Sequence, residues 1–184
     1  MMTKLGIIVG SLRESSFSQQ WADNLADMFP GDWDKSFLEI GDLPLYNEDF
    51  DAEGANPPSE YNRFRKEMSE VDAVLFVTPE YNRSMPATIK NALDVGSRPY
   101  GDSVWDGKPA LVASHSISGI SGFGANHSIR QSLVFLNMPV LQQPEVYLAN
   151  SQDLLEDGKI NNEGTQDFLQ SVVDTYVDFA KKFL

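Results

Sequence analysis

A hydroxyl-rich loop with a single arginine is the first feature of the chain that could do chemistry. Gly10-Ser11-Leu12-Arg13-Glu14-Ser15-Ser16-Phe17-Ser18 directly follows the apolar run Leu5–Val9. The run predicts a buried strand, and helical spacing begins at Phe17. The first N–H groups of a helix have no partner within it and favour an anion. Serine hydroxyls and the Arg13 guanidinium would add donors, so the loop predicts a phosphate monoester site. The side chains concerned are Ser11, Arg13, Ser15, Ser16 and Ser18.

The alternative reading of this loop is a serine-rich cap on an ordinary helix. It is not a Walker A loop, because no Gly-Lys-Ser/Thr follows, and it carries one glycine where the dinucleotide fingerprint has three.

A second loop, Thr78-Pro79-Glu80-Tyr81-Asn82-Arg83-Ser84-Met85-Pro86, follows the apolar run Ala73–Val77. Its two prolines stiffen the backbone beside Tyr81. Such a loop could form a wall against a flat ring, with backbone N–H groups directed at the carbonyls and nitrogens of the ring. The alternative is a proline-bounded connection in which Tyr81 simply packs.

A third loop, His115-Ser116-Ile117-Ser118-Gly119-Ile120-Ser121-Gly122-Phe123-Gly124, has the spacing G-x-x-G-x-G. Glycines allow a ligand to approach the backbone closely, but this order is not the Rossmann G-x-G-x-x-G. The alternative is a flexible connection between a strand and a helix.

Composition excludes several other functions. The chain has no cysteine, which rules out disulfides and thiol catalysis. Its two histidines, His115 and His127, stand in no metal-ligand pattern, and there is no G-x-S-x-G nucleophile. A net charge of −13 disfavours nucleic acid and anionic membranes as partners. With no long apolar stretch or export signal, we expect a cytoplasmic protein.

The 184 residues predict one domain, 1–184, in which strands alternate with helices. The expected strands are Leu5–Val9, Ser36–Ile40, Ala73–Val77, Ala110–Ser114 and Val146–Leu148. A first helix is expected from Phe17, with Trp21 and Leu25 on the same apolar face, a second from a Ser59 cap to Glu70, and a third from Pro86 to Asp94. Two further helices are indicated by apolar residues at helical spacing: Ile129, Leu133 and Leu136, and then Phe168, Val172, Tyr176, Phe179 and Phe183. Residues 41–58 are acidic and proline-containing, and predict a long loop.

This alternation predicts an α/β fold with a parallel sheet covered on both faces. Five strands and five helices suit the flavodoxin-like order 2-1-3-4-5. Ligands of that fold bind beyond the carboxyl ends of the strands, at the topological switch between the first and third strands. The three unusual loops are therefore expected to converge on one site.

Taken together, these segments resemble the NADPH-dependent FMN reductase family, especially its chromate and quinone reductase branch, over residues 4–148. The resemblance is carried by Gly10-Ser11-Leu12-Arg13-x-x-Ser16-Phe17, Leu43-Pro44-Leu45-Tyr46-Asn47-Glu48-Asp49, Thr78–Ser84 with Pro86, Lys90-Asn91-Ala92-Leu93-Asp94, Ser97-Arg98-Pro99, Gly107-Lys108-Pro109, Arg130-Gln131 and Pro144-Glu145.

The resemblance implies a bound FMN. Its phosphate contacts would map to Ser11, Arg13, Ser16 and Ser18, next to Phe17, and the family often has asparagine at the position of Ser18. Contacts to the isoalloxazine ring would map to Pro79, Glu80, Tyr81, Asn82 and Arg83. In the third loop, which starts at His115, either Ser116 or Ser118 would take the role of the family's serine, followed by Gly119. Val95 stands where relatives commonly carry tryptophan.

The resemblance also implies the reaction. Hydride would pass from NADPH or NADH to the flavin N5 and then, in a ping-pong scheme, to small-molecule acceptors such as quinones, azo compounds, chromate or free flavin. No side chain need act as acid or base. Relatives form homodimers or homotetramers, and the helix after the second loop and Trp105 are candidate interface elements.

Two other functions suit the same sequence. A flavodoxin-like electron carrier would bind FMN without turning over nicotinamide, and the strong acidity fits a carrier that is steered to basic partners. A flavin-free hydrolase or binding domain could also use this fold, since fold does not fix function.

Overall fold

The computed structural model describes residues 2–184 and contains a five-stranded parallel sheet. The strand order is β2-β1-β3-β4-β5, which confirms the predicted flavodoxin-like topology. The strands are β1 (Thr3–Val9), β2 (Trp33–Phe37), β3 (Ala73–Thr78), β4 (Ala110–His115) and β5 (Val146–Leu148). Register runs without a break through the centre, with Ile7 opposite Leu75 and Leu75 opposite Leu111.

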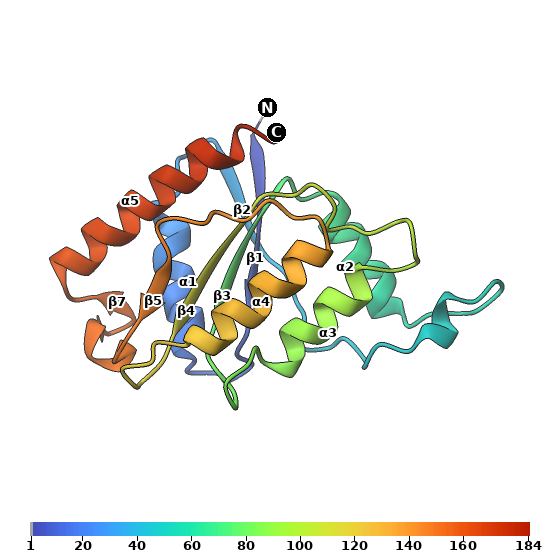
Figure 1. Cartoon of the computed structure of the whole chain (residues 1–184), viewed down its shortest axis with the longest axis horizontal. Helices are drawn as coiled ribbons and strands as arrows, with labels where there is room; N and C mark the ends of the chain where they lie inside the picture. Colours follow the sequence, from blue (N-terminus) through green and yellow to red (C-terminus); the bar gives the residue numbers. More distant parts are fainter. Residues whose placement is uncertain (1) are drawn as a thin grey trace.

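Helices cover both faces of this sheet. Figure 1 shows α1 (Phe17–Met28) and α5 (Glu163–Ala180) on one face, and α2 (Ser59–Ser69), α3 (Ala87–Gly96) and α4 (Phe123–Phe135) on the other. Each face has its own apolar core, because alternate residues of the strands point to opposite sides. The first core contains Trp21 and Tyr176, and the second contains Phe64 and Trp105.

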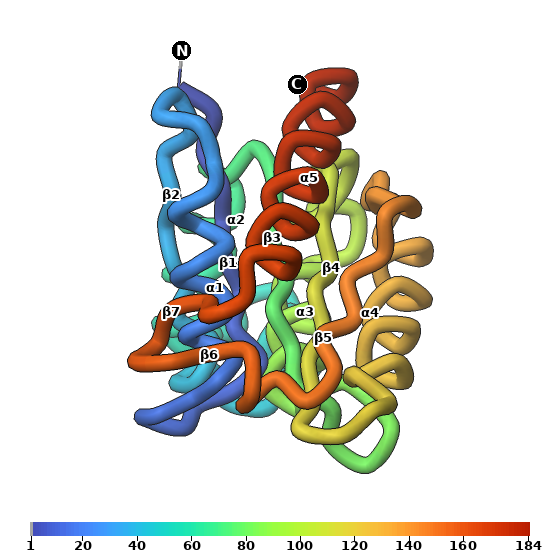
Figure 2. Tube along the Cα trace, turned by 90° about the vertical axis from the view of Figure 1, so that its left-hand side faces the viewer, coloured from blue at the N-terminus to red at the C-terminus, as the bar shows by residue number. Residues whose placement is uncertain are grey.

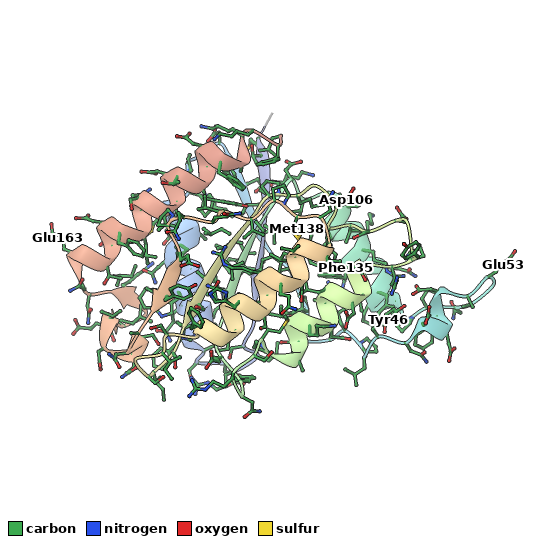
Figure 3. All side chains as sticks on the ribbon, in the orientation of Figure 1. Tyr46, Glu53, Asp106, Phe135, Met138 and Glu163 are labelled. Carbon is green, nitrogen blue, oxygen red and sulfur yellow. The ribbon has the colours of Figure 1, made fainter. Side chains whose placement is uncertain are left out.

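Shorter elements complete the chain. The long loop 41–58 forms as its composition predicts, with one 3-10 turn, η1 (Glu48–Asp51), and it projects from the body with Glu53 at its tip (Figure 3). After β5, a second 3-10 turn, η2 (Ser151–Leu154), leads into a small hairpin of β6 (Leu155–Glu156) and β7 (Lys159–Ile160).

The second strand lies three residues earlier than the sequence predicts. Trp33–Phe37 pair with Thr3–Ile7, and the Leu38 N–H still donates to the Ile7 carbonyl at 2.9 Å, whereas Ile40 lies beyond the strand; both Leu38 and Ile40 are buried in the second core. Their apolar character therefore reflects burial in the second core, which continues after the strand ends.

Two helix starts are also offset. Ser59 is the first residue of α2 and caps nothing, because Pro58 takes the capping position and the Ser59 hydroxyl bonds the Glu60 carboxylate. Pro86 likewise precedes α3, which begins at Ala87. In both cases the proline keeps the extended backbone that ends the preceding loop.

The predicted apolar face of the last helix is partly wrong. Val172 and Tyr176 are buried, but Phe168 and Phe183 are substantially exposed, and the buried stripe runs instead through Leu169, Val173, Val177 and Ala180.

Trp105 is the clearest error. It was expected to be an exposed interface residue, yet it has no exposed surface and its indole N–H donates to the Leu93 carbonyl at 3.1 Å.

The three loops predicted to carry chemistry emerge at the same end of the sheet, opposite the two termini (Figure 2). Gly10 allows the first two loops to meet. A Cβ atom on Gly10 would lie 2.8 Å from Ile89 Cδ1 and 3.0 Å from Pro79 Cδ, so any larger residue would push the loop after β1 away from the loop after β3.

Candidate functional site

The loop after β1 ends in a helix start with free donors. Ser16 is the N-cap of α1, and its hydroxyl accepts a 3.4 Å hydrogen bond from the Gln19 N–H. The N–H groups of Phe17 and Ser18 cannot bond within the helix, and no acceptor for them is found among the described residues. Arg13 is exposed and donates from Nη2 to the Ser15 carbonyl at 2.9 Å. These groups can bind an anion.

These donors border a cavity of about 390 Å³. That volume is within the range of small-molecule sites, which are commonly formed where loops meet at the switch point of such a sheet. All three predicted loops contribute to its lining, which consists of Ser11, Arg13, Ser16, Phe17, Ser18, Pro79, Glu80, Tyr81, His115, Ser116 and Ile117.

The loop after β3 is a tight two-residue hairpin. Tyr81 and Ser84 exchange both backbone hydrogen bonds at 3.0 Å, and Asn82 and Arg83 between them have φ of 52° and 66°. Two consecutive positive φ values are those of a type I′ turn. The turn presents the half-exposed Tyr81 ring beside the cavity, as a wall for a planar group requires.

The Glu80 carboxylate fastens this hairpin to the next helix. Its Oε2 accepts from the N–H of Gly124 at 2.7 Å and of Ala125 at 3.2 Å, in the first turn of α4. The capping position of that helix is Gly122, which has no side chain to offer. Glu80 therefore satisfies two free donors and complements the helix dipole. It also pairs with Arg83 at 3.2 Å.

His115, at the end of β4, lies between two buried serines. Its Nε2 is 2.7 Å from Ser18 Oγ on α1, and its Nδ1 is 3.2 Å from Ser151 Oγ on η2. Burial lowers the pKa of His115 to about 4, because a charged imidazolium would lose its hydration there. The ring is therefore neutral near pH 7.

The Ser18–His115 pair is not a hydrolytic dyad. The second partner of the imidazole, Ser151, is a hydroxyl and not the carboxylate of a catalytic triad, and Ser18 has no exposed surface from which to attack a substrate. Nor is there, within residues 2–184, a cluster of three or more histidine, aspartate or glutamate side chains able to hold a metal ion.

Hydrogen bonds to Ser116 hold the loop after β4 in place. The Ser118 N–H donates to Ser116 Oγ at 3.1 Å, and the Ser116 carbonyl accepts from the Ser151 N–H at 3.0 Å. Of the two serines that could have the family role, Ser116 lines the cavity, while Ser118 does not.

The cavity thus gathers most of the residues singled out in the sequence, but not all. Asn82 and Arg83 shape the hairpin, and with Ser118 and Gly119 they lie outside the lining. Sequence reasoning did not single out Ile117 or Ser151. An isoleucine inside a glycine- and serine-rich loop was the available signal for Ile117, whereas nothing local marked Ser151, which is 36 residues from His115.

Comparisons with known proteins place the chain in a family. The model of the NADPH-dependent FMN reductase family matches residues 3–153. A quinone reductase of Pseudomonas putida is 52% identical over 177 residues, which cover 96% of this chain and 94% of the relative. A 2-hydroxy-1,4-benzoquinone reductase of a Burkholderia species is 38% identical over 182 residues, 98% of each chain.

A solved structure is similarly close. FerB of Paracoccus denitrificans, described as a flavoenzyme NAD(P)H:(acceptor) oxidoreductase, matches with a TM-score of 0.89 and 36% identity over 98% of each chain.

The fold is that of a flavodoxin-like protein, with a cavity lined by three loops at one end of its parallel sheet. The chain belongs to the NADPH-dependent FMN reductase family. It is accordingly an oxidoreductase that works with FMN and NAD(P)H.

Substitution of Gly124 by alanine should displace the hairpin. A Cβ there would lie 2.4 Å from the Arg83 carbonyl oxygen and 2.9 Å from Glu80 Oε2, and the backbone cannot yield cheaply. We expect Gly124→Ala to raise the dissociation constant for FMN about tenfold, measured by flavin fluorescence titration of apoprotein. Gly31→Ala is the control, because a Cβ there meets nothing within 4 Å. Equal affinities in the two variants would contradict the role of Gly124.

His115 should make stability depend on pH. Its folded-state pKa of about 4 lies below the ordinary 6.5, so between these values the unfolded chain binds more protons. The stabilisation is complete above pH 6.5 and declines as the pH falls toward 4, by about 2 kcal/mol between pH 7 and 5. Urea unfolding at both pH values should show that extra loss in the native chain relative to His115→Gln. Parallel pH dependence in both proteins would show that the imidazole is not buried neutral.

Proposed function

We propose that this protein is an FMN-dependent NAD(P)H oxidoreductase that reduces quinones in a ping-pong reaction. Three observations support the proposal: membership of the reductase family, relatives that are named quinone reductases, and the cavity where the three loops meet. The convergence of a helix start and a ring wall on that cavity is the observation that carries it. The proposal treats residues 1–184 as one catalytic domain.

The phosphate of FMN fits the helix start. It would accept from the unpartnered N–H groups of Phe17 and Ser18, and from the hydroxyls of Ser11 and Ser16. Arg13 is the cation of this lining, in a chain whose net charge is −13, and would supply the charge-assisted contact.

The ring fits the opposite wall. Pro79 and Tyr81 offer apolar surface, and the turn at Asn82 and Arg83 holds Tyr81 in place from outside the lining. His115 and Ser116 line the side formed by the loop after β4. Val95 is buried within α3, so it widens no wall of this cavity.

The chemistry that bound FMN supplies is two-electron transfer, from NAD(P)H and then to an acceptor at the same face. The chain's residues bind and orient, and no side chain acts as acid or base. Rigid N–H dipoles near Glu80 would favour negative charge on the ring. Beyond quinones, the proposed acceptors are azo compounds, chromate and free flavin, all small molecules.

The carrier alternative is less well supported. A flavodoxin-like carrier would share the fold and the acidity, but relatives at 52%, 38% and 35% identity carry the names of reductases. No helix of residues 2–184 is long and apolar enough to cross a membrane. We propose that the enzyme works in the cytoplasm, where NAD(P)H is available, and that it binds no nucleic acid.

We also propose that the enzyme is a homodimer or homotetramer. One apolar surface lies at the C-terminal end of α4, where Val134 and Phe135 are 76% and 84% exposed (Figure 3). Phe135 borders a hollow of about 380 Å³ whose other wall is α3, with Lys90 and Asp94. Large apolar side chains gathered on one face are typical of association sites.

An anaerobic titration tests the proposed function. The FMN-loaded protein is titrated with NADPH or NADH while its visible spectrum is recorded, and a benzoquinone is then added. Bleaching by one nucleotide followed by recovery with the quinone is the expected result. A bound flavin that bleaches only with dithionite would identify a carrier, and a protein that binds no flavin would overturn the cofactor assignment.

Removing the Arg13 charge should weaken FMN binding by one to two orders of magnitude, because a charge-assisted hydrogen bond contributes about 1.5–3 kcal/mol. Arg13→Ala and the control Lys181→Ala, which removes an exposed cation on the far end of the molecule, are compared by fluorescence titration. Affinity for riboflavin, which lacks the phosphate, should stay unchanged in both. Unaltered FMN affinity in Arg13→Ala would remove this residue from the site.

A charge on the α4 surface should prevent association. We expect Phe135→Glu to shift the protein to monomer in light scattering coupled to gel filtration. Phe183→Glu places the same charge on a half-exposed phenylalanine beyond α5 and should leave the assembly intact. An unchanged mass for Phe135→Glu would show that copies associate through another surface.

A further inference from the structure

A buried chain of three side chains joins separate segments at the floor of the cavity. Ser18 belongs to the first turn of α1, His115 to the last position of β4, and Ser151 to η2. The two links are 2.7 Å and 3.2 Å long, and they span 97 and 36 residues of sequence. Ser18 and Ser151 have no exposed surface, and His115 has 5%.

This geometry gives Ser18 a different task from the one the family pattern implies. Its hydroxyl is already hydrogen-bonded to the imidazole at 2.7 Å, which directs it toward His115. Its backbone N–H, in contrast, has no partner among the described residues. Side chain and N–H share one Cα atom, so fixing the hydroxyl also fixes the direction of that N–H.

We propose that His115 is a positioning residue for the phosphate subsite, which it builds by holding the first turn of α1 through Ser18 while Ser151 holds the ring from behind. The inference rests on the proposed function, since it assigns a role within the FMN site. It makes the chain Ser18–His115–Ser151 a determinant of selectivity for FMN over riboflavin.

The choice of side chain follows from the number of bonds to be made. Imidazole offers two ring nitrogens on opposite sides, and both are used. Each hydroxyl can donate or accept, so a neutral ring satisfies both serines in either tautomer. The ring is anchored on β4, a strand with neighbours on both sides, which gives the helix start a rigid reference.

Preorganisation explains why such a link would matter for affinity. Free N–H groups at a helix start bind an anion best when no reorganisation is needed on binding. Apart from the link, the first turn of α1 is held by the Ser16 cap, whose bond to the Gln19 N–H is long at 3.4 Å, by the Gln20 N–H bond to the Ser16 carbonyl at 3.2 Å, and by Phe17 against the first core.

The test compares two ligands that differ only in the phosphate. Dissociation constants of apoprotein for FMN and for riboflavin are measured by fluorescence titration in native chain, Ser18→Ala, Ser151→Ala, His115→Phe and the double variant Ser18→Ala/His115→Phe. We expect His115→Phe to weaken FMN binding at least tenfold and to leave riboflavin binding within twofold. The double variant should be no worse than His115→Phe, because both substitutions break the same bond.

Other outcomes are equally decisive. If His115→Phe weakens both ligands alike, the residue is merely structural, and if it weakens neither, the link has no role in binding; either result overturns the inference. His115→Gln, which keeps two polar atoms, replaces the phenylalanine variant if thermal unfolding shows that the latter does not fold, and is held to the same criterion of selective loss. A native chain that binds neither flavin would instead overturn the proposed function.

Discussion

The parallel pairing of β1 with β3 is the constraint on which this molecule depends. It places the chain's first loop beside the loop after β3, because the segment that follows β1 returns as the edge strand β2 on the other side. Gly10 then lets the two loops touch, since a Cβ atom would meet Ile89 and Pro79. The loop after β1 and the loop after β3, separated by about sixty residues of sequence, become two sides of one cavity.

The charged groups that line the cavity differ from the acidic average of the chain. The chain carries a net charge of −13, yet the lining has Arg13, free N–H groups of α1 and a Glu80 carboxylate already used by the start of α4. The acidic side chain at the site is thus neutralised by a helix end and by Arg83, which leaves the α1 donors free for an anionic ligand. His115 contributes polarity without charge.

The sequence predicted the strands of the sheet centre well, because β3 and β4 are continuous apolar runs buried on both faces. It failed at β2, where Leu38 and Ile40 are buried in the second core at and beyond the end of the strand, and at Trp105, which was a candidate interface residue but is buried in the same core. In both cases a long-range contact, invisible to local pattern, decided the burial. Glu80 is a similar case: its position in the loop was evident, but its partners in α4 are 44 and 45 residues away.

What the sequence determined by itself was the order of elements, the three loops that carry the site and the family, because each depends on residue types at fixed local spacing. Only the tertiary structure decided which side chains of those loops face the cavity and which bond to other segments. It sets Ser116 and not Ser118 against the cavity, turns the Ser18 hydroxyl away from it toward His115, and brings in Ser151 from beyond β5. The physical reason is that hydrogen-bond partners and exposed surface are set by segments that meet only when the sheet closes its core.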